Sequence, residues 1–180
     1  AEDLIKSMDE AGIDNAVVSA IGWSSHELCH EHNHYLMETV SRWGHRLIGL
    51  GMVQPLQQSE CEREVERIYN GGLKGIGVFR PDVMGIDLEY PAVMQPFVDA
   101  LFSRGMILQV HASEPTGHQY PGKGQLTPEV LLRFIQTHTR LTVVLAHWGG
   151  GLPFYELQPE VRKNLENVYY DTAATPFVYD

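Results

Sequence analysis

The sequence predicts an α/β fold built on a parallel sheet, and two observations lead to this prediction. Apolar runs of strand length alternate with amphipathic segments of helix length along the chain, which is the pattern of repeated strand–helix units. The runs begin about every 30 residues, close to the length of one unit in an eightfold (β/α) barrel. A helix between two strands brings the second strand back in the direction of the first, so the strands are expected to be parallel.

Six strands and six helices account for most of the chain. The apolar, β-branched runs predict strands at Asn15–Ala20, Leu47–Val53, Leu73–Phe79, Met106–His111, Leu141–His147 and Asn167–Asp171. The amphipathic segments predict helices at Glu2–Ala11, His32–Trp43, Glu60–Asn70, Ala92–Arg104, Pro128–Thr139 and Pro153–Leu165. Some ends carry clear signals, such as Gly105 as a C-terminal cap and Thr127 as an N-cap before a first-turn proline.

The number of units is smaller than a closed eightfold barrel requires. The chain opens on a helix with no preceding strand and stops just past a strand, at Asp180. The first and last strands of such a barrel are neighbours, so the absent part would be one contiguous slice of the wall. We therefore expect residues 1–180 to form a single (β/α)8 TIM-barrel domain, incomplete with about six βα units, within a longer protein. A complete, doubly wound six-stranded sheet is the alternative.

The composition disfavours several classes of partner. Lys and Arg number 13 against 23 Asp and Glu, so the net charge of -10 opposes binding to nucleic acid or to an anionic membrane surface. No apolar run approaches the roughly 18 residues of a membrane span. The two cysteines, Cys29 and Cys61, form neither a disulfide framework nor a metal-binding pair by spacing, which favours a cytoplasmic location. A small molecule is the expected partner.

Two of the expected strands end in histidine. His111 closes MILQVH, and His147 closes LTVVLAH, which runs directly into three glycines. The carboxyl ends of parallel strands carry the reactive groups in such folds, and side chains on adjacent strands can converge there. Imidazole is the commonest metal ligand and the usual general base near neutral pH. A single histidine at a strand end is more often structural, but two on consecutive strands favour a functional site.

Longer motifs in the same regions resemble a known family. The runs HASEPTGH, LAHWGGG and NVYYDTAATPF, with MDEAGIDNAVV and LKGIGVFRP upstream, resemble amidohydrolase family 2. This family comprises metal-dependent TIM-barrel hydrolases and decarboxylases that are similar to aminocarboxymuconate semialdehyde decarboxylase. The resemblance spans nearly all of the chain, and its most specific parts are AHWGGG and YYDTAA. It implies a metal-dependent enzyme.

The resemblance also implies roles for the two histidines. In the family, a His-X-His pair on the first strand, a histidine on the fifth and an aspartate on the eighth bind one divalent metal ion, usually zinc. A histidine on the sixth strand handles the activated water. His111 matches the fifth-strand metal ligand, and His147 matches the sixth-strand catalytic residue. The first-strand pair and the eighth-strand aspartate have no counterpart in these 180 residues, so the 180 residues alone are expected to be inactive.

Further residues are candidates for substrate binding and catalysis. Arg80, in VFRPD, is the best-placed cation for a substrate carboxylate, because a guanidinium donates two parallel hydrogen bonds. Lys123 and His118, in the long loop after the fourth strand, are the next candidates. Trp148 would wall the pocket, and Asp171, at the end of the last strand, would accept a hydrogen bond from a metal-site histidine or an arginine. The structural alternatives are loop surface for the three cations, core filling for the tryptophan and a turn cap for the aspartate.

A histidine-rich stretch and a charged stretch receive structural interpretations. Residues 26–34, HELCHEHNH, do not follow an apolar run, so we interpret them as a loop over the barrel mouth with Asn33 capping the next helix. A metal site on His30 and His34, four residues apart, is the less favoured alternative. The run CEREVERIYN, which contains Glu64, is interpreted as a solvated helix face.

Together these expectations define a function. We expect part of an enzyme that uses one divalent metal ion, on the resemblance zinc, to hydrolyse, hydrate or decarboxylate a small, carboxylated molecule. Many members of the family are dimers, so a homodimer is expected. A metal-free doubly wound enzyme is less favoured, because the chain has no Gly-X-Ser-X-Gly motif. A non-catalytic barrel relative that acts as a binding subunit is the other alternative.

Overall fold

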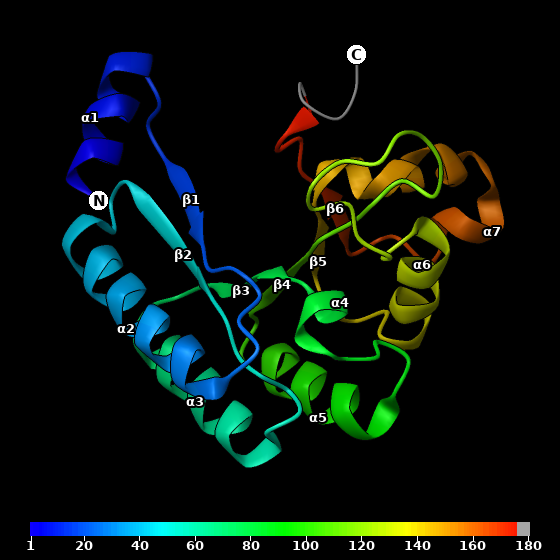
Figure 1. Ribbon diagram of the computed structural model, residues 1–180, viewed down its shortest axis with the longest axis horizontal. Coiled ribbons are helices and arrows are strands. Elements are labelled where there is room, and N and C mark those ends of the chain that lie inside the picture. The colour runs from blue at the N-terminus through cyan, green and yellow to red at the C-terminus, as the bar shows by residue number, and fades with distance from the viewer. Residues whose placement is uncertain (176–180) are drawn as a thin grey trace.

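The computed structural model describes residues 1–175, which form one six-stranded sheet flanked by helices (Figure 1). All neighbouring strands are parallel, and their order in the sheet follows their order in the chain. They are β1 (Ala16–Ser19), β2 (Leu47–Gly51), β3 (Gly75–Phe79), β4 (Ile107–Val110), β5 (Val143–Leu145) and β6 (Val168–Tyr170). A doubly wound sheet reverses its strand order at a switch point. The sequential order therefore confirms the barrel prediction, and the chain is a partial barrel.

The helices lie on the outer side of the curved sheet. They are α1 (Glu2–Ala11), α2 (His26–Trp43), α3 (Gln58–Asn70), α4 (Pro81–Met84), α5 (Pro91–Phe102), α6 (Pro128–Thr137) and α7 (Pro159–Arg162), with a 3₁₀ segment, η1 (His147–Leu157), between β5 and α7. Figure 1 shows α2, α3, α5 and α6 around the outside and β1 and β6 at the two edges. Apolar side chains between the strands and these helices form the main core. Within residues 1–175, none of the helices is both long and apolar enough to cross a membrane.

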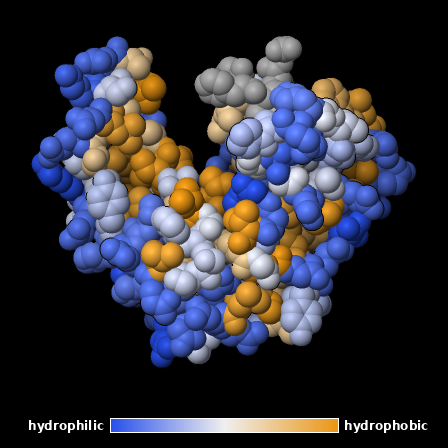
Figure 2. Space-filling model, viewed as in Figure 1, coloured by the Kyte–Doolittle hydropathy of each residue, from blue (hydrophilic) through white to orange (hydrophobic). Residues whose placement is uncertain are grey.

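The inner side of the sheet is open near its two edges. Val17 of β1 pairs in register with Ile48 of β2, and these residues are 57% and 41% exposed. Tyr169 of β6 is 60% exposed. Figure 2 shows a notch beside the arm that contains α1 and β1, with apolar residues along the wall of that arm. A closed barrel fills this space with layers of side chains from alternate strand positions, so these residues occupy the positions of an inner layer.

All six predicted strands are present, each within its predicted range. Each is shorter than predicted, in part because apolar residues next to a strand can be buried without joining the hydrogen-bonded ladder. Met52 and Val53, for example, follow β2 and are fully buried. Apolar content therefore marks the position of a strand better than its exact end.

Helix α2 begins at His26 rather than at His32, so the interpretation of residues 26–34 as a loop is wrong. Ser25 caps the helix, and its Oγ accepts a hydrogen bond from the N–H of Leu28 at 3.3 Å. A serine cap followed by an acidic first turn is a helix start signal. The polar composition of the first two turns concealed it.

A buried polar group joins α2 to α3. Asn33 is not a cap but lies buried inside α2, where it donates to the main-chain O of Met52 at 2.7 Å and to Oε1 of Glu64 at 2.7 Å. The Glu64 side chain is only 2% exposed and also binds Arg67 and His30, so its assignment to a solvated face is wrong. Burial raises the pKa of this carboxyl, but the hydrogen bonds from its three partners outweigh burial and lower the pKa to about 2.

The last predicted helix, Pro153–Leu165, does not form as one continuous element. The chain instead forms η1, which contains Pro153, and then α7, which begins at Pro159. Proline lacks the N–H that a continuous helix requires and clashes with the preceding turn. Pro153 stands at the first position of the predicted helix, where proline is tolerated, so Pro159 is the residue that separates η1 from α7.

Candidate active site

The two histidines predicted at strand ends meet in space. His111 directly follows β4, and His147 begins η1 just after β5. Strands β4 and β5 are neighbours in register, with Val110 beside Leu145, so the chain leaves the sheet at the same level in both. The two imidazole rings lie edge to face, with centroids 5.0 Å apart and planes at 75°. Adjacent parallel strands thus bring two imidazoles to one point on the carboxyl edge of the sheet.

His111 is held as a neutral imidazole. It is 7% exposed, and its Nε2 lies 3.2 Å from Oγ of Ser113. That hydroxyl oxygen accepts from the N–H of Gly124 at 2.8 Å, so its own proton can point at the ring. Burial lowers the pKa of His111 to about 4, and the charges of Arg80 and His147 add to this effect. A neutral imidazole keeps a lone pair near neutral pH, as a metal ligand requires.

The three glycines after His147 allow a turn that most side chains would block. From His147 through Gly151 every residue has a positive φ, between 55° and 99°. A Cβ on Gly150 would lie 2.5 Å from the main-chain O of Ser113, and one on Gly149 would lie 2.9 Å from the ring of Tyr170. The glycines therefore let the turn press against the loop that follows His111, which brings the two histidines together.

The His147 ring has a defined tautomer. Its Nδ1 lies 2.6 Å from the main-chain O of Ala173, and a carbonyl oxygen only accepts, so Nδ1 carries the proton. In the neutral ring, Nε2 then carries the lone pair. A nitrogen in this state can take up a proton from a reacting group or return one to it.

Asp171, just past β6, holds the backbone around His147. Its Oδ1 accepts from the N–H of His147 at 3.1 Å and from the N–H of Ala173 at 3.0 Å. Its Oδ2 accepts from Nε2 of Gln109 at 2.8 Å. Sequence reasoning missed Gln109, although one signal was available. The residue lies two positions before His111, so it points to the same face of the strand.

Arg80 lies close to His111 but is already paired. Its Nε and Nη2 donate to the two carboxylate oxygens of Asp82 at 3.1 and 2.7 Å, and the Arg80 side chain is 20% exposed. Burial raises the pKa of Asp82, but the hydrogen bond and charge of Arg80 outweigh burial and lower it. The pair is therefore ionic at neutral pH, and it fixes the plane of the guanidinium.

The other predicted substrate residues lie on the loop after β4 and on η1. Lys123 donates from Nζ to the main-chain O of Thr116 at 2.7 Å and of His118 at 3.2 Å, so it braces the loop after β4. His118 is exposed, and its ring centroid lies 5.6 Å from that of Tyr120. Trp148 is 42% exposed and does not fill the core. It lines an apolar hollow of about 580 Å³ on η1.

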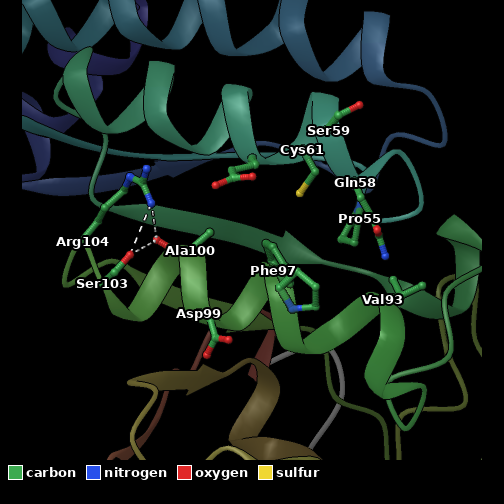
Figure 3. Close-up of a pocket in the computed structure, with 12 residues that line it drawn as sticks. Pro55, Gln58, Ser59, Cys61, Val93, Phe97, Asp99, Ala100, Ser103 and Arg104 are labelled. Atoms are coloured by element: carbon green, nitrogen blue, oxygen red, sulfur yellow. Dashed lines mark hydrogen bonds between the residues drawn. The ribbon is translucent and has the colours of Figure 1, made fainter.

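A second hollow, of about 360 Å³, lies between α3 and α5 on the helical side of the sheet. Figure 3 shows Cys61 and Phe97 along it, with Arg104 at one end. Burial raises the pKa of the Cys61 thiol to about 12, so the sulfur is not a nucleophile at neutral pH. None of the predicted site residues lines this hollow, so it is separate from the candidate site.

One described residue, His111, has the chemistry of a metal ligand. In the stretch from residue 1 to residue 175, no group of three or more His, Cys, Asp or Glu side chains is arranged to hold a metal ion. The His111 ring nevertheless fits as one donor, because it is neutral and imidazole commonly binds divalent metal ions. A complete centre would need ligands from outside this stretch.

Several solved structures share this fold. The chain is similar to 5-carboxyvanillate decarboxylase from Sphingomonas paucimobilis, with 20% identity and a TM-score of 0.72 over 94% of this chain and 64% of that one. It is similar to 2,6-dihydroxybenzoate decarboxylase from Rhizobium, with 21% identity and a TM-score of 0.71 over 94% and 68%. It is also similar to a dihydroxybenzoic acid decarboxylase from a Polaromonas species, solved with manganese and 2-nitroresorcinol, with 21% identity and a TM-score of 0.67 over 93% and 66%.

These likenesses establish the fold, and the chain spans about two thirds of the length of each structure. Manganese, rather than the expected zinc, is the metal in the Polaromonas structure. A search of curated protein sequences gives no match. The family assignment comes from the sequence profile of the amidohydrolase family, which matches residues 2–179. Because this match spans nearly the whole chain, including both strand-end histidines, the protein belongs to the amidohydrolase family.

Proposed function

We propose that this chain is the larger part of a metal-dependent enzyme that decarboxylates a small, carboxylated aromatic molecule. The observation that carries the proposal is the meeting of His111 and His147 at the ends of adjacent strands. The substrate class is supported by the similar structures, which are decarboxylases of hydroxybenzoates and of carboxyvanillate. Hydrolysis is the second candidate, because the matching family is described as amidohydrolase.

We also propose that residues 1–180 are one domain of a longer protein. The similar structures are longer than this chain, which covers 64% to 68% of them. The missing ligands of a metal centre would then come from the rest of the barrel wall. The homodimer and the cytoplasmic location stay predictions.

His147 would move the proton in this reaction. In non-oxidative decarboxylation, the ring carbon that carries the carboxylate gains a proton, and the electron pair of the breaking C–C bond returns to the ring as carbon dioxide leaves. Nε2 of His147 would first take up a proton from water or from the substrate and then deliver it to that carbon, while Nδ1–H stays bound to the carbonyl of Ala173. In hydrolysis, the same nitrogen would accept a proton from the attacking water.

His111 would bind the metal ion. A divalent ion, when bound, would polarise the oxygen atoms of the substrate and stabilise negative charge on them. The neutral state of His111 suits this role, and the contact between Oγ of Ser113 and Nε2 would help to orient the ring. The identity of the ion, manganese or zinc, is part of the test.

Arg80 is the proposed partner of the substrate carboxylate. Asp82 holds two of its nitrogen atoms, so the remaining N–H groups of a fixed guanidinium would face the ligand. His118 and Lys123 would contribute through the loop that follows β4, and Trp148 would form an apolar wall.

The test compares two alanine variants in the longer, metal-loaded protein. His111→Ala is expected to lower the bound manganese or zinc strongly, because it removes a ligand. His147→Ala is expected to keep the metal and lose turnover by about 100-fold or more, because general acid–base groups contribute on that scale. Metal analysis and carbon dioxide release from 2,6-dihydroxybenzoate and 5-carboxyvanillate measure the two effects.

His138→Ala serves as the control, because His138 is a buried histidine at the end of α6 that lies outside the site. It should change neither metal content nor turnover in the folded protein. Ester or amide cleavage without decarboxylation would favour hydrolysis instead. Ligand binding without turnover of any substrate would indicate a binding subunit and overturn the enzymatic proposal.

A further inference from the structure

We propose that Gln109 is a positioning residue that fixes the His147 imidazole through Asp171. The inference rests on the proposed proton transfer by His147. Nε2 of Gln109 donates to Oδ2 of Asp171 at 2.8 Å, and Oδ1 of Asp171 accepts from the N–H groups of His147 and Ala173. The carbonyl of Ala173 accepts from Nδ1 of His147 at 2.6 Å. Asp171 therefore holds the backbone N–H of His147 and the backbone N–H of Ala173. Ala173 is the residue whose carbonyl fixes the tautomer of the His147 ring.

The backbone at His147 needs such a tie. His147 and Trp148 both have φ of 55°, a conformation that residues with a Cβ adopt rarely. Left-handed conformations of this kind persist only where surrounding contacts hold them. The carboxylate of Asp171 supplies such a contact at the first residue of the turn.

The length of Gln109 suits this task. It lies on β4, whereas Asp171 follows β6, and β5 lies between them. Neighbouring strands are about 4.8 Å apart, so the Gln109 side chain, the hydrogen bond and the Asp171 side chain together span two strand spacings. Asparagine would be too short for that distance. On β3, Gly77 leaves the necessary space, because a Cβ there would lie 2.6 Å from Oε1 of Gln109.

The polarity of Gln109 also indicates a role. Its Oε1 is buried and has no hydrogen-bond partner among residues 1–175. An unsatisfied buried amide oxygen destabilises a fold, so an apolar side chain such as that of Ile107 on the same face would pack better here. The carboxylate of Asp171 only accepts hydrogen bonds, so it needs a donor on β4. Glutamine at position 109 supplies that donor with its Nε2.

The decisive variant is Gln109→Met, made in the longer, metal-loaded protein. Methionine keeps the length and volume of glutamine but donates no hydrogen bond. We expect kcat to fall about 10- to 100-fold, as is typical when a supporting partner is removed, with KM within about twofold of the parent. Metal content and thermal stability should stay near those of the parent, because His111 and the packing are unchanged.

A second readout does not depend on turnover. In the metal-free protein labelled with ¹⁵N-histidine, at about pH 8, ring-nitrogen shifts report which nitrogen of each neutral imidazole carries the proton. The His147 signal, assigned by its loss in His147→Gln, should show the Nδ1–H form in the parent and a mixture of both tautomers in Gln109→Met. Gln109→Asn should behave in the same way, because it cannot reach Asp171.

Gln95→Met is the matched control. Gln95 makes the same type of bond, from Nε2 to Oδ1 of Asp99 at 2.9 Å, but on the exposed side of α5. It should leave kcat and the tautomer unchanged. An unchanged kcat and tautomer in both Gln109 variants would overturn the proposal. Full activity of His147→Ala would instead overturn the proposed function, and the tautomer measurement would still decide the role of Gln109.

Discussion

At the scale of single residues, the segment from His147 to Gly151 explains how one strand end presents an imidazole. Five consecutive positive φ values wind the chain in the left-handed sense directly after β5. Glycine is needed at Gly150 for two reasons, since its φ is +61° and a Cβ would lie 2.5 Å from the main-chain O of Ser113. At Gly151, with φ of +99°, a Cβ would meet no heavy atom within 4 Å, so only the backbone conformation requires glycine.

The contrast between these two glycines gives a prediction. Gly151→Ala should lower the free energy of unfolding by about 1 kcal/mol, because alanine must adopt a left-handed φ. Gly150→Ala should cost about 2 to 4 kcal/mol, because the same strain is joined by a clash with backbone. Denaturant unfolding of both variants measures the difference, and equal losses would mean that the contact with Ser113 is not a tight one.

At the scale of secondary-structure elements, Glu64 links α3 to α2 by an ionic group that is almost fully covered. Its partners come from both helices, with Arg67 on α3 and His30 and Asn33 on α2. The folded pKa of about 2 lies below the ordinary 4.5 of a glutamic acid. The stabilisation is therefore fully present above about pH 4.5 and is lost as the pH falls towards 2.

The corresponding prediction is a pH-dependent effect of Glu64→Gln. At pH 7 the variant should be less stable by about 1 to 2 kcal/mol, because glutamine keeps the shape but loses the charge that pairs with Arg67. The difference should shrink as the parent carboxylate becomes protonated. Glu66→Gln, an exposed position on the same helix, is the control and should change stability by less than about 0.5 kcal/mol. A loss that is the same at pH 7 and at low pH would contradict the assigned role of the charge.

The strands could be predicted from the sequence, but important features of α2 and α3 could not. Strands were located correctly because a buried parallel strand is a continuous apolar run, as in the segment around Val143. The start of α2 was missed because its first turns are polar, and the burial of Glu64 was missed because helical spacing alone does not distinguish a solvated carboxylate from one buried against a neighbour. Local hydrophobic periodicity carries no information on which residues of distant segments contact each other.

For the candidate site as well, the sequence predicted some features and missed others. The proximity of His111 and His147 follows from two equivalent strand ends on neighbouring strands, which a sequence can reveal. The contribution of Gln109 depends on a side chain that crosses an intervening strand to Asp171. The tautomer of His147 depends on a carbonyl 26 residues away. The two-residue period places Gln109 on the same strand face as His111, but its bond to Asp171 and the tautomer of His147 have no periodic signature, so only the structure reveals them.

At the scale of the whole molecule, the partial barrel has an ordinary outer core and an uncovered inner face. Val65, on α3, is fully buried against the sheet, whereas Val17, on the inner face of β1, is 57% exposed. Closed barrels pack such inner residues in layers. Under the proposal that residues 1–180 belong to a longer barrel, Val17 would be buried in the longer protein and exposed in the 180-residue chain.

Val17→Thr tests this difference, because threonine keeps the β-branched shape and adds only a hydroxyl. In the 180-residue chain we expect a change in stability below about 0.5 kcal/mol, since water already reaches the site. In the longer protein we expect a loss of about 1 to 3 kcal/mol, because the hydroxyl would be buried without a partner. Val65 is buried in the 180-residue chain and should also be buried in the longer protein, so Val65→Thr is the control. It should lower the free energy of unfolding by about 1 to 3 kcal/mol in both proteins. A small effect of Val17→Thr in both proteins would show that the rest of the longer protein does not cover the inner face of β1, which would contradict the closed barrel.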